Sequence, residues 1–191
     1  MSCVERIVHR YAFLGQQAWL EKEWGAIEEP DRDSCGEGFG SMKILLVCSG
    51  NTCRSPMGEG LARKMLGSQT DGESAGTHPT RDRAADEAVE VMRSRFGIDI
   101  SSHRPRNVKD VSVEDFDYVV AMDSGVAGDL RRIYPSINAR LISWDMHDPW
   151  GGGVEAYERA ARESQKHVEE LSACLKENGA LSLYSSLSAF D

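Results

Sequence analysis

Long apolar runs are missing from this sequence of 191 residues. No stretch approaches the roughly eighteen consecutive apolar residues that a membrane-spanning helix needs. The first residues, Met1 to Arg6, also lack the apolar core of a signal peptide. We therefore expect no membrane partner and a cytoplasmic location.

The cysteines do not form a recognisable framework. There are five, an odd number at irregular spacing, which argues against a set of disulfides and favours a reducing compartment. No Cys/His spacing resembles a zinc site, so we expect no metal and no cofactor. The cysteines are Cys3, Cys35, Cys48, Cys53 and Cys174.

Positive charge is also scarce. The chain has 22 Lys and Arg against 31 Asp and Glu, a net charge of −9. This balance disfavours nucleic acid as a partner, because phosphate backbones need a basic face. It still permits a small phosphorylated group, since the field at one loop can be positive within an acidic protein. The length, with 40% hydrophobic and 28% charged residues, suits one α/β domain with extensions.

The most informative stretch is Val47 to Met57, V-C-S-G-N-T-C-R-S-P-M. The apolar run before it, Lys43 to Val47, predicts a buried parallel strand, and a helix is predicted from about Pro56 to Leu66. We expect Gly50 to let the backbone turn inward, so that successive N–H groups point at one oxyanion. The helix N-terminus adds positive potential there.

Two side chains of this loop suit phosphate chemistry. Arg54 offers a bidentate fork for two phosphoryl oxygens. Cys48 lies among positive partial charges that favour its thiolate, which would make it a nucleophile. The alternative is that Cys48 is only a buried cysteine at a strand end, a common fate of free cysteine. The coincidence of strand, glycine, arginine and helix start favours the nucleophile.

The longer string C-x-G-N-x-C-R-S-P resembles the active-site loop of the low-molecular-weight protein tyrosine phosphatase family, and most closely its bacterial members. The resemblance implies an α/β fold of three layers, a four-stranded parallel sheet with helices on both faces. It also implies that Cys48 is the nucleophile, Arg54 binds phosphate, Asn51 orders the loop and Ser55 stabilises the thiolate. The phosphate-binding loop would comprise Ser49, Gly50, Asn51, Thr52, Cys53, Arg54 and Ser55.

The segments that follow continue the resemblance. Ser74-Ala75-Gly76 stands where the family has a second strand, whose small residues let the backbone pass close to the loop. The segment His78 to Asp82 would wall the substrate pocket, with Thr52 and His78 lining it. A helix is expected next, with an apolar face and Gly97 as its C-terminal stop. That face comprises Ala84, Ala88, Val91, Met92 and Phe96.

His103 stands in a family pattern in which the histidine bonds the loop through its Asn and Ser. Without the resemblance, it would read as a surface histidine in a loop. Phe116 to Met122 and Arg140 to Ile142 are expected as strands. Asp123 is predicted to cap the intervening helix and to be structural.

The Asp148-Pro149 pair lies in a loop after the last strand. An aspartate in such a turn most often caps the next helix. The resemblance instead implies that Asp148 is the general acid and that Trp150 walls the pocket. A long packing helix from Val154 to Leu175 is expected after it.

The ends of the chain do not resemble the family. Residues 1–41 form an extension, predicted helical over 4–24 and then a linker, with docking through Trp19 and Trp24 as the alternative. Met42 is a candidate start of the protein. Residues 42–178 form the phosphatase domain and 179–191 a tail.

The expected activity is a metal-independent protein phosphatase, a monomer that acts on phosphorylated protein. Thr52 favours phosphoarginine as the substrate, because relatives specific for tyrosine usually carry an aliphatic residue there. Phosphotyrosine is the alternative. An arsenate reductase, which would need two further cysteines, and a non-catalytic phosphate-binding module are less favoured. Cys53 is expected either to pack the loop or to form a reversible disulfide with Cys48.

Overall fold

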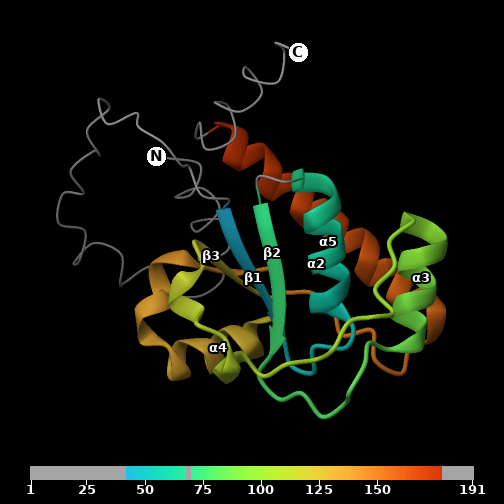
Figure 1. Ribbon diagram of the computed structural model, residues 1–191, viewed down its shortest axis with the longest axis horizontal. Helices are drawn as coiled ribbons and strands as arrows, with labels where there is room; N and C mark the ends of the chain where they lie inside the picture. The colour runs from blue at the N-terminus through green and yellow to red at the C-terminus, as the bar shows by residue number, and fades with distance from the viewer. Residues whose placement is uncertain (1–41, 68–69, 178–191) are drawn as a thin grey trace.

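The computed structural model describes residues 42–67 and 70–177. The predicted helix over 4–24, the linker and the tail lie outside these residues. Four parallel strands form one sheet in the order β2-β1-β3-β4 (Figure 1). The strands are β1 Met42–Cys48, β2 Thr70–Gly76, β3 Tyr118–Ala121 and β4 Leu141–Ser143. The predicted four-stranded parallel sheet is confirmed.

Helices cover both faces of the sheet, as Figure 1 shows. One face carries α2 (Arg54–Leu66), α3 (Asp86–Phe96) and α5 (Gly153–Glu177). The other carries α4 (Ser124–Ile133) and the short helices η2 (Val108–Asp110), η3 (Val113–Asp115) and η4 (Pro135–Arg140). The three layers expected from the resemblance are present. None of the helices in the described ranges is long and apolar enough to span a bilayer.

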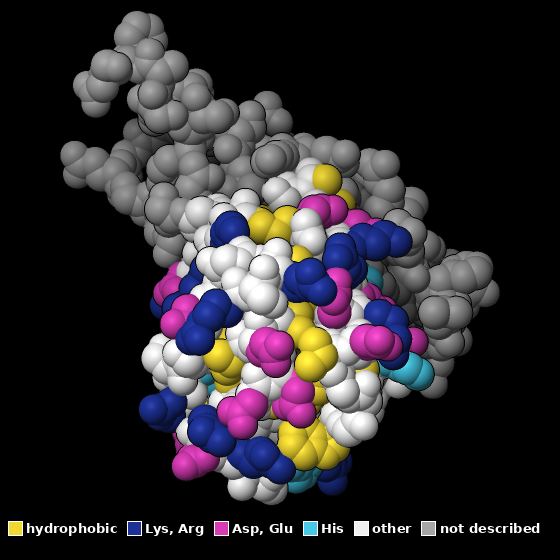
Figure 2. Space-filling model, turned by 90° about the vertical axis from the view of Figure 1, so that its right-hand side faces the viewer, with side chains coloured by type: hydrophobic (Ala, Val, Ile, Leu, Met, Phe, Trp, Pro, Cys, Tyr) yellow, Lys and Arg dark blue, Asp and Glu magenta, His cyan; other side chains and the backbone are white. Residues whose placement is uncertain are grey.

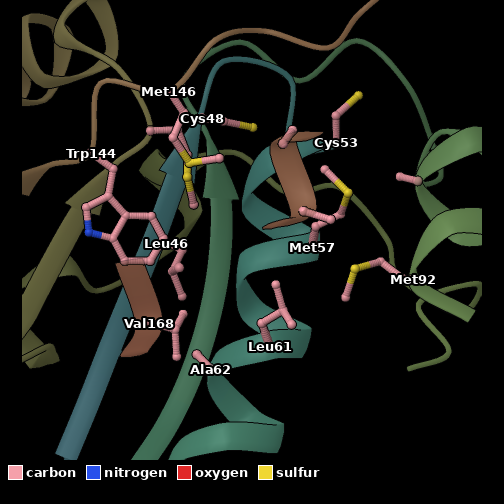
Figure 3. Close-up of a cluster of buried hydrophobic side chains, with 14 of the residues drawn as sticks. Leu46, Cys48, Cys53, Met57, Leu61, Ala62, Met92, Trp144, Met146 and Val168 are labelled. Atoms are coloured by element: carbon pink, nitrogen blue, oxygen red, sulfur yellow. The ribbon is translucent and has the colours of Figure 1, made fainter. Parts of the chain in front are cut away.

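The apolar run of β1 explains its central place. Ile44, Leu45, Leu46 and Val47 are all fully buried, because each face of a central parallel strand is covered by helices. Ile44 and Leu46 pack toward α2 and α5, whereas Leu45 and Val47 pack toward α4. Figure 3 shows the first of these cores, where Leu46 and Trp144 lie near Met57 and Leu61 of α2.

Some helices begin at other residues than the sequence predicts. Helix α2 begins at Arg54 rather than Pro56, because the Cys53 carbonyl already accepts a hydrogen bond from Met57 N at 3.2 Å. Ala84 is buried but precedes α3. Gly97 does end α3, in the left-handed conformation with φ of 63°.

The two later strands also differ from their predicted bounds. β3 begins at Tyr118, since the Phe116 amide turns back to bond the Val113 carbonyl at 3.3 Å. β4 begins one residue after Arg140, which is the last residue of η4.

Candidate active site

Cys48 ends the central strand, and the loop that follows it carries donors toward its sulfur. The Asn51 amide donates to Cys48 Sγ at 3.1 Å, and Ser55 Oγ lies 3.0 Å from the same atom. All three residues are buried. Hydrogen bonds to the charged form of an acid favour that form, so these contacts stabilise a sulfur anion.

The left-handed position of the loop is Asn51, the residue after Gly50. Asn51 has a φ of 53°, in the left-handed region, whereas no positive φ occurs at Gly50. Asparagine tolerates this region better than most residues. Hydrogen bonds of its side chain offset the backbone strain. Oδ1 accepts from Arg106 N at 3.0 Å, and Nδ2 donates to Ser55 Oγ at 2.9 Å.

A hydrogen-bonded chain extends from the loop to α2. Asn51 Nδ2 also donates to Ser74 Oγ at 2.9 Å, and Ser74 Oγ donates to Glu59 Oε2 at 2.6 Å. Ser55 Oγ accepts from Asn51, so its own proton is available to Cys48 Sγ at 3.0 Å or to the Ala75 carbonyl at 3.4 Å. The shorter distance favours the sulfur.

Sequence reasoning did not assign Ser74 or Glu59 to the site. Glu59 looks like an ordinary helix charge, because it also pairs with Arg63 one turn later at 3.0 Å. The available signal was Ser74 itself, a polar residue in β2, the strand that pairs with β1. Its side chain is 2% exposed, and a buried polar side chain needs a hydrogen-bond partner.

His103 supports the same loop from the segment after α3. Its Nε2 lies 3.0 Å from the Asn51 carbonyl oxygen, and its Nδ1 lies 3.9 Å from Glu59 Oε2. Burial lowers the pKa of His103, although the Glu59 carboxylate and the bond to Asn51 oppose this. A neutral ring with its proton on Nε2 donates to the carbonyl. The contact reaches Asn51 as expected, but none of the hydrogen bonds described for His103 reaches Ser55.

The start of the loop is fastened to the end of β2. Thr77 N donates to the Cys48 carbonyl at 3.0 Å and His78 N to the Ser49 carbonyl at 2.8 Å. A Cβ on Gly76 would lie 2.7 Å from the Ser49 carbonyl oxygen, so only glycine permits this approach. The close passage expected from Ser-Ala-Gly is therefore present.

Arg54 joins three segments that are far apart in the sequence. Its side chain is 4% exposed, and Nη1 donates to Asp123 Oδ2 at 2.7 Å and to the Met146 carbonyl at 3.1 Å. Nη2 donates to Asp148 Oδ2 at 3.0 Å. Asp123 also caps α4 by accepting from Val126 N at 2.8 Å. Asp123 is thus a cap, as predicted, and in addition it holds the Arg54 guanidinium, a contact that sequence reasoning missed.

Asp148 reaches the loop from the segment after β4. One carboxylate oxygen bonds Arg54, and the other accepts from Trp150 N at 3.2 Å. The second bond is the turn contact that aspartate commonly makes with a backbone N–H two residues on. Both the turn role and the proximity to Arg54 are therefore present. The side chain is 55% exposed, so solvent reaches the carboxylate.

The remaining predicted wall residues lie in different places. Trp150 is 52% exposed, and the Arg81 guanidinium carbon lies over its ring, 4.2 Å from the centroid. His78 is largely exposed, with Nδ1 3.0 Å from Thr77 Oγ1 and 3.9 Å from Asp129 of α4. Thr52 is buried.

The side chains of the loop residues Thr52 and Cys53 contact each other. Cys53 Sγ lies 3.4 Å from both Thr52 Oγ1 and the Tyr157 hydroxyl oxygen. Burial raises the pKa of the Cys53 thiol. The pKa of Tyr157 is raised as well, chiefly by burial. Cys53 is thus a neutral thiol that packs the loop against α5.

Comparisons with known proteins identify a matching family model and several similar proteins. Residues 43–181 match the model of the low molecular weight phosphotyrosine protein phosphatase family. The crystal structure of a low molecular weight protein tyrosine phosphatase from T. tengcongensis is 35% identical, with a TM-score of 0.64 over 69% of this chain and 97% of that one. The YwlE arginine phosphatase from Geobacillus stearothermophilus is 28% identical, with a TM-score of 0.66 over 71% of this chain and 93% of that one. Arsenate reductase 1 of Staphylococcus haemolyticus is 34% identical over 69% of this chain and 96% of its own length.

Proposed function

Because the chain belongs to the low molecular weight phosphotyrosine protein phosphatase family, we propose that it hydrolyses phosphorylated protein side chains through a cysteinyl-phosphate formed on Cys48. The observation that carries the proposal is the buried Cys48 sulfur, which meets the Asn51 amide and the Ser55 hydroxyl within 3.1 Å. The hydrogen bond from Arg54 of the same loop to Asp148 supports Asp148 as the acid of the reaction.

The first step forms the S–P bond. The Cys48 thiolate attacks phosphorus in line with the leaving atom, while the loop amides and Arg54 hold the equatorial oxygens. The bond from phosphorus to the leaving nitrogen or oxygen breaks, its electron pair goes to the leaving atom, and Asp148 supplies the proton.

The second step releases phosphate. Asp148, now a carboxylate, takes a proton from water, and the oxygen of that water attacks phosphorus. The S–P bond breaks and its electrons return to Cys48 as the thiolate. Ser55 and the Asn51 amide stabilise the anion in its role as leaving group.

Phosphoarginine is the substrate that we favour. Thr52 in the loop supports it, because a β-branched hydroxyl side chain narrows the site and biases attack toward a P–N bond. Similarity to the Geobacillus arginine phosphatase is a second support. Asp148 would then protonate the departing guanidine nitrogen.

Phosphotyrosine is the second candidate. The exposed ring of Trp150, two residues from Asp148, is a surface on which an aromatic substrate can stack. The T. tengcongensis relative, a tyrosine phosphatase, also supports this candidate.

Arsenate reduction is disfavoured despite the relative of that name. The reaction requires two further cysteines to relay a disulfide, and the sequence has no cysteine between Cys53 and Cys174.

Side-by-side rates on phosphoarginine and phosphotyrosine test the substrate. We expect faster hydrolysis of phosphoarginine, and a shift toward phosphotyrosine in Thr52→Ile. Faster hydrolysis of phosphotyrosine by the natural chain would reverse this ranking. Turnover of para-nitrophenyl phosphate blocked by vanadate separates an enzyme from a binding module.

Two substitutions test the chemistry itself. Cys48→Ser should abolish turnover because it removes the nucleophile. Arg54→Lys should lower turnover by at least about a hundredfold, the effect typical of losing one oxyanion donor. Substantial activity in both variants would refute the assignment.

A further inference from the structure

The loop between β2 and α3 is fastened at both ends to the phosphate-binding loop. At its start, His78 N donates to the Ser49 carbonyl at 2.8 Å, and at its end Ala85 N donates to the Thr52 carbonyl at 2.9 Å. Arg81 lies midway between these two anchors. Its position is therefore tied to the loop that carries Cys48.

Trp150, from the segment between β4 and α5, contacts the Arg81 side chain. The guanidinium carbon lies 4.2 Å from the centroid of the indole ring, within the range of a cation–π contact. The Trp150 amide donates to Asp148 Oδ1 at 3.2 Å. The stacked pair thus links the β2–α3 loop to the loop of the general acid.

A guanidinium stacked on a ring keeps its N–H groups free, because they point outward in the plane of the group. Within the described part of the chain, no carboxylate forms an ion pair or hydrogen bond with Arg81, although Asp82 is its neighbour. Arg83, two residues away, is by contrast paired with Asp86 at 3.3 Å. Arg81 is therefore a preorganised cation with open donors, and Trp150 connects it to the segment that carries Asp148.

Positive charge is scarce in this chain, so a single cation can matter for binding an anion. The whole chain carries −9. On the face that Figure 2 shows, Lys and Arg alternate with Asp and Glu, so this face presents no broad basic surface. Screening in physiological salt limits exposed charges to about 8 Å, so a substrate group must lie next to Arg81 to feel it.

We propose that Arg81, stacked on Trp150, binds an acidic side chain next to the phosphorylated residue and so selects protein substrates with Asp or Glu at that position. The carboxylate would accept two N–H bonds from the fork of Arg81. This inference rests on the proposed phosphatase activity and adds a preference for flanking sequence.

The test uses the full-length chain and matched phosphopeptides that carry either Glu or Gln on both sides of the phosphorylated residue. One pair carries phosphoarginine and the other phosphotyrosine. The measured quantity is the ratio of kcat/KM for the Glu peptide to that for the Gln peptide. An exposed charge pair predicts a ratio of about two to five at low salt.

Arg81→Gln should bring the ratio to about one, and 0.5 M salt should do the same for the natural chain. Arg83→Gln is the matched control on the same loop, and should leave the ratio unchanged. Trp150→Leu should lower the ratio, because Arg81 then loses the ring that holds it.

A ratio of one or less in the natural chain, or a ratio that survives Arg81→Gln, would overturn the inference while the phosphatase proposal stands. Absence of turnover on para-nitrophenyl phosphate and on every peptide would overturn both.

Discussion

Replacing Asp148 by Asn should separate catalysis from phosphate binding. Arg54 Nη2 donates a hydrogen bond to Asp148 Oδ2 at 3.0 Å. In the proposed mechanism, that nitrogen is one of the donors that hold a phosphoryl oxygen. Binding of phosphate must therefore compete with the Asp148 carboxylate, and Asn keeps the shape of the side chain without its charge or its acid function.

The two effects have opposite signs and different sizes. Loss of a general acid lowers turnover by about 10²- to 10⁴-fold. The ion pair is more than half exposed on the Asp148 side, so its contribution is at most about 1 kcal/mol after solvent screening. Its removal should tighten inorganic phosphate by no more than about fivefold.

The assay is para-nitrophenyl phosphate turnover with phosphate as a competitive inhibitor, so that kcat and the inhibition constant are measured in the same series. Asp145→Asn is the matched control. It removes the same charge from an exposed site in the same loop, and its φ of 52° suits Asn. We expect Asp145→Asn to change neither constant greatly.

Weaker phosphate binding in Asp148→Asn would refute the competition argument. Retention of full turnover would refute the acid role. An equal effect of Asp145→Asn on the inhibition constant would show that the general charge of the loop, and not the contact with Arg54, governs phosphate binding.

Three further predictions concern the support of the loop. Ser74→Ala removes one of the two hydrogen bonds of Asn51 Nδ2 and the hydrogen bond to Glu59 Oε2, so it should lower the free energy of unfolding by about 1–3 kcal/mol and lower kcat; an unchanged denaturation midpoint would contradict the role of this chain of hydrogen bonds. Burial lowers the pKa of His103 below its ordinary 6.5, so the unfolded chain takes up the proton first as the pH falls. Stability should therefore decrease as the pH drops through 6.5 and level off below the folded pKa. In His103→Gln, the midpoint of thermal unfolding should depend less on pH across this window. Peroxide inactivation should be reversed by dithiothreitol in the natural chain but not in Cys53→Ser, if Cys53 protects Cys48 as a disulfide; equal recovery of both would leave Cys53 a packing residue.

Much of the fold follows from local patterns. The apolar run of β1 predicts a strand covered on both faces, and Gly97 predicts the end of α3, because each depends on neighbouring residues alone. The motif likewise brings four residues into one short loop: Cys48, Asn51, Arg54 and Ser55. Their proximity is a property of the chain and needs no distant contact.

Other features depend on residues that only the folded chain brings together. Arg54 meets Asp123 and Asp148, which lie 69 and 94 residues away, and the sequence of either aspartate reads as a simple cap or turn. Ser74 links Asn51 to Glu59 because β2 pairs beside β1. The left-handed residue is Asn51 rather than Gly50, because four hydrogen bonds hold its side chain and carbonyl, and they come from three separate segments.

The sequence by itself therefore predicts the loop that follows Cys48, because its residues are neighbours in the chain, and the resemblance that this loop carries predicts the layered sheet. The tertiary structure decided which carboxylates hold Arg54, how Asn51 is supported and that Arg81 stacks on Trp150. Charged and polar side chains pair with groups that lie close in space. When the two groups belong to segments far apart in the sequence, the spacing of residues does not reveal that hydrogen bond.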